Sequence, residues 1–301
     1  MKHVVGISLG SDARNHSVTV NLLGTECKVE RIATNGDLNA MISYIKENDG
    51  KVDAFGLGGM DLYLYAVDKR YIIRDAQKVV NAAKKTPIVD GSGLKNTLER
   101  RVIKYIAEET NILNGNPKVL LMSAMDRIGM AQAFEEAECK MIYGDFPFAL
   151  KIPIPMYSLK TVAFAARMLV PIIRLLPFKM IYPTGKSQEI NKPRFVKFYE
   201  KADIIAGDFH FIRKNMPEEL PGKTIITNTV TMSDLDFLRE RKVKTLITTT
   251  PELDGRSFGT NVIEALMVCL AGGEGELSCD EYSRMLGLLD FKPRIIELNK
   301  V

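Results

Sequence analysis

The sequence contains no C-x-x-C pair, no Cys/His cluster, no long basic block and no low-complexity tail. Its four cysteines lie far apart, so we expect reduced thiols in a cytoplasmic protein without a metal site. The 41 basic and 37 acidic residues are interspersed. This argues against nucleic-acid binding, which requires clustered Lys and Arg. The first residues, MKHVVGISLG, carry only a short apolar run, which is typical of a first strand and not of a signal peptide.

Long uninterrupted apolar runs are also missing. The most apolar stretch, 158–182, is interrupted by Arg167 and Arg174, and Pro171 would break a helix that crossed a membrane. We therefore expect no stable membrane insertion. The stretch fits a helix that packs on the core or on a second subunit, which would make it a homodimer interface, and an interfacial membrane helix is the alternative.

The chain does contain a regular alternation of short apolar runs and amphipathic segments, and its 301 residues are enough for two domains. Strands are expected at 4–10, 17–24, 27–33, 53–59, 87–93, 118–123, 139–145, 202–208, 223–229 and 243–250, and helices at 37–48, 76–85, 94–109, 131–138, 158–182, 233–241 and 261–272. Period-2 alternation predicts a hairpin at 62–75, and Ser233 is the expected cap of the helix at 233–241. Such an alternation predicts an α/β fold with a doubly wound parallel sheet.

The polar stretch NGNP, 114–117, is the expected boundary between domains. Residues 1–113 would form an N-terminal α/β substrate domain. Residues 114–301 would form a C-terminal Rossmann-like nucleotide-binding domain, whose last helix could return to the N-terminal domain.

Residues 119–134, VLLMSAMDRIGMAQAF, have the strand–turn–helix layout of a dinucleotide-binding unit. Where such a unit carries G-x-G-x-x-G, this chain has Ser123 and Ala124, which are small enough for close approach of a pyrophosphate, and Gly129, which permits close helix packing. Cofactor binding and a purely structural turn are both open readings of this stretch.

Three charged residues bear on that choice. Asp126 could cap the helix and occupy the anion site itself, whereas Arg127 could contact a phosphate. Asp145 follows the turn by about twenty residues, where an acidic side chain would bind a ribose 2′-hydroxyl. Since no Arg comes directly after Asp145, NAD is preferred over NADP.

A second motif, IVDGSGL, precedes this unit, and ADIIAGD and GRSFGTNVIEALMVCLAG follow it. With its D-G-x-G-[FL] pattern, this arrangement resembles the shikimate/quinate dehydrogenase family. The resemblance implies NAD(P)-linked hydride transfer on a small polar substrate, with Asp90 acting on the substrate hydroxyl. The family's N-V-T-x-P-x-K segment has no counterpart here, so no catalytic lysine is assigned. The alternative for Asp90 is an Asx-turn or a helix cap.

Polar side chains follow the later strands. His210 comes just after the strand at 202–208 and is the candidate proton acceptor, with a packing role as the alternative. Thr250, Arg256 and Asn261 could bind a polyol, a carboxylate or a phosphate. Asn228 ends the neighbouring strand and could line the same crevice, next to the cofactor.

The leading hypothesis is an NAD(P)-dependent oxidoreductase that acts on a small hydroxy or keto compound. Asp90 or His210 would exchange the hydroxyl proton. The alternative is a non-catalytic Rossmann-like binding or regulatory protein that has lost dinucleotide affinity. An enzyme of the same fold that acts on acyl or amino-acid substrates is a third reading.

Overall fold

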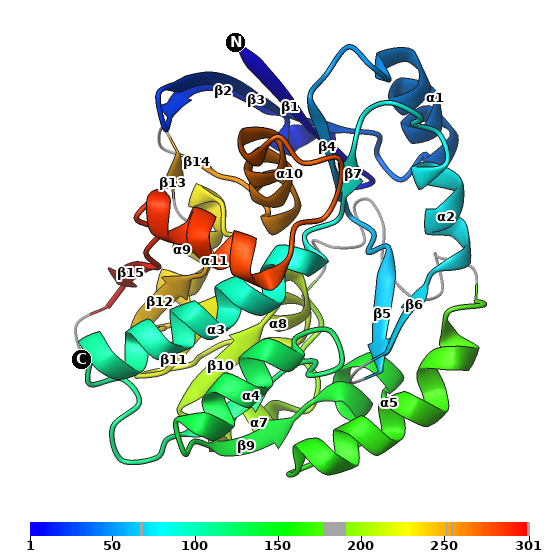
Figure 1. The fold of residues 1–301 in the computed structure, drawn as a ribbon. Helices are drawn as coiled ribbons and strands as arrows, with labels where there is room; N and C mark the ends of the chain where they lie inside the picture. Colours follow the sequence, from blue (N-terminus) through cyan, green and yellow to red (C-terminus); the bar gives the residue numbers. More distant parts are fainter. Residues whose placement is uncertain (67–68, 177–190, 251, 254–255, 300–301) are drawn as a thin grey trace. The chain divides into compact units, whose positions relative to one another are not determined.

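The computed structural model describes residues 1–66, 69–176, 191–250, 252–253 and 256–299. The chain divides into two compact units, each assembled from segments that are distant in the sequence. Unit 1 contains Met1–Thr97, Met168–Gln188 and Leu253–Phe291, and unit 2 contains Leu98–Arg167, Glu189–Glu252 and Lys292–Val301. The protein is thus a mixed α/β fold with one principal sheet in each unit (Figure 1). The domain boundary expected after residue 113 stays a prediction.

Unit 1 is built on a five-stranded sheet in the order β2-β3-β1-β4-β7. Its elements are β1 (Lys2–Ser8), η1 (Asp12–Arg14), β2 (His16–Leu22), β3 (Thr25–Ala33), α1 (Leu38–Asn48), β4 (Ala54–Gly58), β5 (Tyr63–Ala66), β6 (Lys69–Ile72), α2 (Arg74–Val80), β7 (Ile88–Val89), β14 (Arg256–Ser257), α10 (Thr260–Ala271) and α11 (Cys279–Leu288). β3, β1, β4 and β7 run parallel, while β2 is antiparallel at the edge. β5 and β6 form the expected hairpin.

Burial of the strands explains this arrangement. β1 and β4 are apolar and almost fully buried, as central parallel strands must be, whereas exposure alternates along the edge strand β2. α10 packs directly on β1 and β4. A Cβ at Gly56 would lie 2.5 Å from the carbonyl oxygen of Asn261, so glycine permits this close approach.

Unit 2 contains a six-stranded sheet in the order β9-β8-β10-β11-β12-β15 (Figure 1). Its elements are β8 (Lys118–Leu121), α4 (Ile128–Glu136), β9 (Lys140–Tyr143), the π-helix η2 (Asp145–Leu150), α7 (Val196–Lys201), β10 (Ile204–Gly207), α8 (Phe209–Asn215), β11 (Thr224–Thr227), α9 (Met232–Glu240), β12 (Thr245–Thr248) and β15 (Arg294–Glu297). α3 (Ser92–Glu109), α5 (Leu159–Ile173) and β13 (Glu252–Leu253) contribute residues to both units.

The strand order of unit 2 corrects the Rossmann expectation. Numbered along the chain, its strands lie in the order 2-1-3-4-5-6, with only the last strand antiparallel. The dinucleotide-binding Rossmann sheet has the order 3-2-1-4-5-6, and the order 2-1-3-4-5 belongs to the flavodoxin-like arrangement. In that arrangement the second strand lies on one side of the first strand, and the third strand lies on its other side. The switch point of unit 2 therefore lies between β8 and β10.

Two local expectations about helices also need correction. α5 contains Pro171 and ends at Ile173, before the end expected at residue 182. α9 begins one residue earlier than expected, with Thr231 and Asp234 forming a capping box where Ser233 was expected to be the cap. Within the described ranges, no helix combines the length and the apolar character that crossing a membrane requires.

Candidate functional site

The turn between β8 and α4 is closed by an acidic side chain of the protein itself. The carboxyl group of Asp145, which is only 2% exposed, accepts the backbone N–H groups of Ala124 (3.1 Å) and Met125 (2.9 Å) and the hydroxyl of Ser123 (3.2 Å). Burial raises the pKa of Asp145, and these three hydrogen bonds oppose that rise. The small residues of the turn thus allow Asp145 to approach the backbone.

This geometry does not fit a pyrophosphate. The amides that would bind it already donate to Asp145, and that side chain points into the turn and not toward a ribose. Gly129 is buried within α4. The carboxylate that binds the turn amides is that of Asp145, whereas the sequence had raised Asp126 as the acid that could occupy this anion position.

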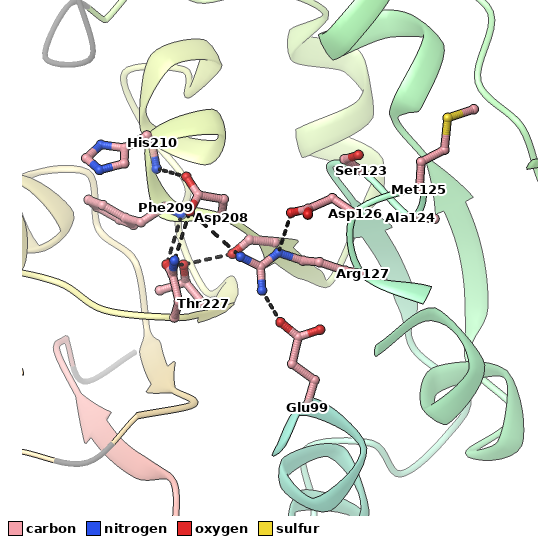
Figure 2. Close-up of polar contacts among 12 residues, drawn as sticks. Glu99, Ser123, Ala124, Met125, Asp126, Arg127, Asp208, Phe209, His210 and Thr227 are labelled. Atoms are coloured by element: carbon pink, nitrogen blue, oxygen red, sulfur yellow. Dashed lines mark hydrogen bonds and ion pairs between the residues drawn. The ribbon is translucent and has the colours of Figure 1, made fainter. Parts of the chain in front are cut away.

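Arg127 is the centre of a charged cluster beside this turn (Figure 2). Its guanidinium, only 3% exposed, forms an ion pair with Glu99 of α3 and lies 3.9 Å from Asp126 and 3.7 Å from Asp208. Glu99 is also buried, whereas Asp126 and Asp208 are about one-third exposed. Three acidic side chains therefore surround one cation.

Asp208 follows β10 and has polar partners besides Arg127. It accepts a hydrogen bond from the backbone N–H of His210 (2.9 Å; Figure 2). It also accepts one from the side-chain amide of Asn228 (2.8 Å). Burial opposes its ionisation, but the nearby charges of His210 and Arg127, with these hydrogen bonds, hold the pKa of Asp208 below its ordinary value. Asp208 is consequently an ionised acceptor whose side chain remains 28% exposed.

Asn228 and Thr250 hold the neighbouring strand ends in place. The side-chain oxygen of Asn228 accepts from the backbone N–H of Phe209 (3.3 Å) and from the hydroxyl of Thr227 (3.1 Å). The buried hydroxyl of Thr250 donates to the carbonyl of Asn228 (3.0 Å). The structure thus brings together the turn residues, Arg127, His210 and Asn228 at the carboxyl edge of this sheet. Thr250 contributes through its hydrogen bond to Asn228.

Asp90 belongs to unit 1, and both of its oxygens are occupied. Oδ1 accepts the N–H (2.9 Å) and the hydroxyl (2.5 Å) of Ser92, and Oδ2 accepts the N–H of Leu62 (2.5 Å). Its side chain is buried at the start of α3. The structure thus favours the Asx-turn reading over proton transfer to a substrate.

The remaining sequence candidates also belong to unit 1. Asn261 begins α10, and its amide donates to the carbonyl of Gly56 (3.1 Å), which joins the helix to β4. Arg256 lies in β14, and its side chain is outside the described part of the chain.

Asp208 and Glu264 were not singled out from the sequence. Asp208 is the last residue of the ADIIAGD motif, and an acid at a strand end next to a candidate histidine is a signal that could have identified it. Glu264 stands in the apolar run NVIEALMV of α10 and is fully buried. Its carboxyl group accepts from the N–H groups of Gly91 (2.5 Å) and Leu94 (3.2 Å) and from the hydroxyl of Tyr282. A lone acid in an apolar helical run indicates such a buried partner network.

Unit 2 also has a surface hollow of about 590 Å³, and none of the residues that line it belongs to the Arg127 cluster. Its lining consists of Arg100, Gln132, Glu135, Glu136 and Leu159. Arg100 pairs with Gln132 and Glu136, so its charge is already balanced within the lining. We place no ligand there.

The comparison with protein families identifies the chain. The model described as a domain of unknown function, DUF8754, matches residues 93–298, and the chain belongs to this family. A second domain of unknown function, DUF8753, matches residues 3–90. No curated protein matches the chain.

Solved structures similar to the chain are mainly sugar solute-binding proteins of ABC transporters. One from Burkholderia multivorans is 12% identical over 98% of this chain and 99% of that chain, with a TM-score of 0.36. One from Agrobacterium radiobacter, in complex with D-arabinose, is 13% identical over 98% and 94%, with a TM-score of 0.38. One from Actinobacillus succinogenes, with bound D-allose, is 11% identical over 94% and 100%, with a TM-score of 0.39. Likeness at this level assigns no ligand to this chain.

The resemblance to the shikimate/quinate dehydrogenases was therefore wrong, and so was the oxidoreductase hypothesis drawn from it. The matched family is a different one, and the similar structures are mainly solute-binding proteins. The physical reasons lie in unit 2, where the strand order differs from the Rossmann order and Asp145 occupies the expected pyrophosphate position. Binding of NAD or NADP is an expectation from the sequence alone, and a titration with NAD and NADH measures it directly.

Proposed function

We propose that this protein is a non-catalytic binding protein for a small, uncharged, hydroxyl-rich ligand. Its site would lie at the switch point of unit 2, against Asp208, Arg127 and His210. The observation that carries this proposal is the partly exposed carboxylate of Asp208, held in place by Asn228 and by the backbone of α8. In open α/β sheets, ligands bind outside the carboxyl ends of the strands at a switch point.

Charge supports an uncharged ligand. One guanidinium faces the acidic side chains of Glu99, Asp126 and Asp208, so a phosphate or carboxylate would meet net repulsion. A hydroxyl can donate to the Asp208 carboxylate and accept from a neighbouring N–H at the same time, which makes a polyol a better match than an anion. The cluster offers polar contacts that orient a ligand, and we assign it no bond-making step.

The test is calorimetric titration of the purified chain with D-ribose, D-galactose and myo-inositol, and with NAD and NADH as anionic comparison compounds. We expect heat from at least one polyol and none from the dinucleotides. Asp208→Asn should weaken polyol binding by roughly tenfold to a hundredfold, because it removes a charged acceptor and leaves its partners without an anion.

Asp236→Asn is the matched control, because Asp236 is also in unit 2 but is 67% exposed on α9. It should leave the affinity unchanged. Absence of polyol heat, or equal losses in the two variants, would overturn the proposal. If NADH gives heat and Asp208→Asn abolishes it, the site binds a dinucleotide and not a polyol.

A further inference from the structure

α5 presents an apolar stripe outward. Phe164, Met168, Ile172 and, just beyond the helix, Leu175 are 68%, 62%, 64% and 56% exposed. Their spacing of four, four and three residues places them on one helical face. Single exposed apolar residues are ordinary, but three in register on one helix, with a fourth just after its end, are a feature that needs a partner.

The opposite face of the same helix is already used by the protein. Val162, Ala165, Ala166 and Val170 are all at most 8% exposed. Leu169 and Ile173 on this face are half-buried. α5 is therefore held against the protein by this face, while Phe164, Met168 and Ile172 are exposed on the other face.

The sequence segment that contains the stripe carries charge of one sign, although Glu135 and Glu136 line a hollow together with Leu159 at the start of α5. None of residues 146–176 is acidic, whereas four of them are basic. Lys160, Arg167 and Arg174 recur every seven residues, so helical geometry places them along one margin of the stripe. Lys160 and Arg167 are exposed, and Arg174 lies over the ring of Tyr71 at 5.6 Å.

This combination matches an anionic bilayer surface better than a second copy of the chain. Two copies joined through α5 would bring their basic margins together. A helix of 15 residues, about 22 Å long and about 10 Å wide, also offers far less than the roughly 800 Å² that each partner of a stable dimer buries. Anionic lipid headgroups would pair with the basic margin while the stripe enters the boundary of the acyl chains.

We propose that α5 docks this protein reversibly on anionic membrane surfaces, with Phe164 and Met168 entering the lipid and Lys160 and Arg167 contacting the headgroups. The docking is peripheral, because the helix lies along the surface with its other face on the protein. It is independent of the ligand site proposed for unit 2.

The chain has no tryptophan, which makes a direct test available. Phe164→Trp introduces a single fluorophore into the stripe, and Met232→Trp introduces one at a control position that is 65% exposed on α9. With vesicles of phosphatidylcholine containing 30% phosphatidylserine, as probe composition, Phe164→Trp emission should shift to the blue and Met232→Trp emission should not. Cosedimentation should be roughly tenfold weaker on pure phosphatidylcholine.

Variants of the unlabelled chain complete the test. Phe164→Ser with Met168→Ser, and separately Lys160→Glu with Arg167→Glu, should each abolish cosedimentation, while the controls Leu288→Ser and Lys46→Glu should not. Circular dichroism checks that every variant is folded. Absence of a blue shift on the anionic vesicles overturns the proposal. A dimer in sedimentation velocity that the Phe164/Met168 variant dissociates, without vesicle binding, would assign the stripe to a second copy instead.

Discussion

The two sheets of this protein share one arrangement of parallel strands but differ at their switch points. In unit 1, β1 lies between β3 and β4, and in unit 2, β8 lies between β9 and β10. The switch point of unit 1 is closed by main chain: Leu9 donates its N–H to Gly58 (3.0 Å), and Gly59, with a φ of 72°, lies against Leu9 and Gly10. The switch point of unit 2 holds Arg127 and the partly exposed Asp208 instead.

This difference teaches that the topology supplies a location for a ligand but not the means to bind one. Where glycines let the backbones approach, the position is filled by the fold itself. Where longer polar side chains follow the strands, donors and acceptors remain at the surface. From the strand order alone, a ligand site would be expected equally in both units.

Both units also bury an acidic side chain against backbone amides, and the largest expected effect concerns the one in unit 1. Burial, and next the charge of Asp90, raise the pKa of Glu264 from its ordinary 4.5 to about 8. Its folded pKa lies above its unfolded value, so its contribution to stability is complete below about pH 4.5 and is lost as the pH rises through 8. We expect the free energy of unfolding to fall by about 4 kcal/mol over this window.

Glu264→Gln should remove most of this pH dependence, because the amide stays uncharged and keeps an acceptor for the backbone N–H groups. Urea unfolding followed by circular dichroism at pH 5, 7 and 9 measures the free energy of unfolding of the wild-type protein and of the variant. If the free energy of unfolding changes with pH in the same way in the wild type and in the variant, Glu264 does not titrate in this range.

In unit 2, Asp145→Ala should lower the free energy of unfolding by about 3 kcal/mol. The change leaves the buried N–H groups of Ala124 and Met125 without their acceptor, at roughly 1–3 kcal/mol each. Asp145→Asn should lose less, since its amide oxygen can still accept. If Asp145→Ala unfolds at the wild-type urea concentration, the turn does not depend on this carboxyl group.

The closed switch point of unit 1 predicts a smaller effect. Gly59→Ala should destabilise by about 2 kcal/mol, because a left-handed residue would gain a Cβ 3.1 Å from the nitrogen of Leu9. Gly24→Ala is the control, since Gly24 has a similar φ of 77° with nothing within 4 Å, and it should cost about 1 kcal/mol. Equal losses in thermal unfolding would show that only backbone strain matters there.

Much of the local structure followed from sequence patterns. The strands after apolar runs and the β5–β6 hairpin lie where periodicity placed them, because buried strands and hairpins carry strong local signals. The end of α5 and the cap of α9 did not, since α5 ends at Ile173 and Thr231 forms the capping box with Asp234 that Ser233 does not.

The candidate site was predictable only in part. A strand end followed by a polar turn directed attention to Ser123, Arg127 and His210, which the structure brings to one sheet edge, and their binding role stays a prediction. The pairing of acids with donors was not predictable. Asp145 and Asp126 are equally suited by type to satisfy the turn amides, and only the direction of each side chain decides between them.

The sequence by itself determined the α/β class, the order of strands and helices along the chain, and the placement of polar residues after the strands of unit 2. These features depend on short-range periodicity and on burial, which neighbouring residues encode. The tertiary structure alone decided the lateral order of the strands and therefore where the switch points lie. It also decided which carboxyl groups are enclosed by backbone amides and which remain exposed, because hydrogen bonds between residues 20 or more positions apart depend on how the strands pair.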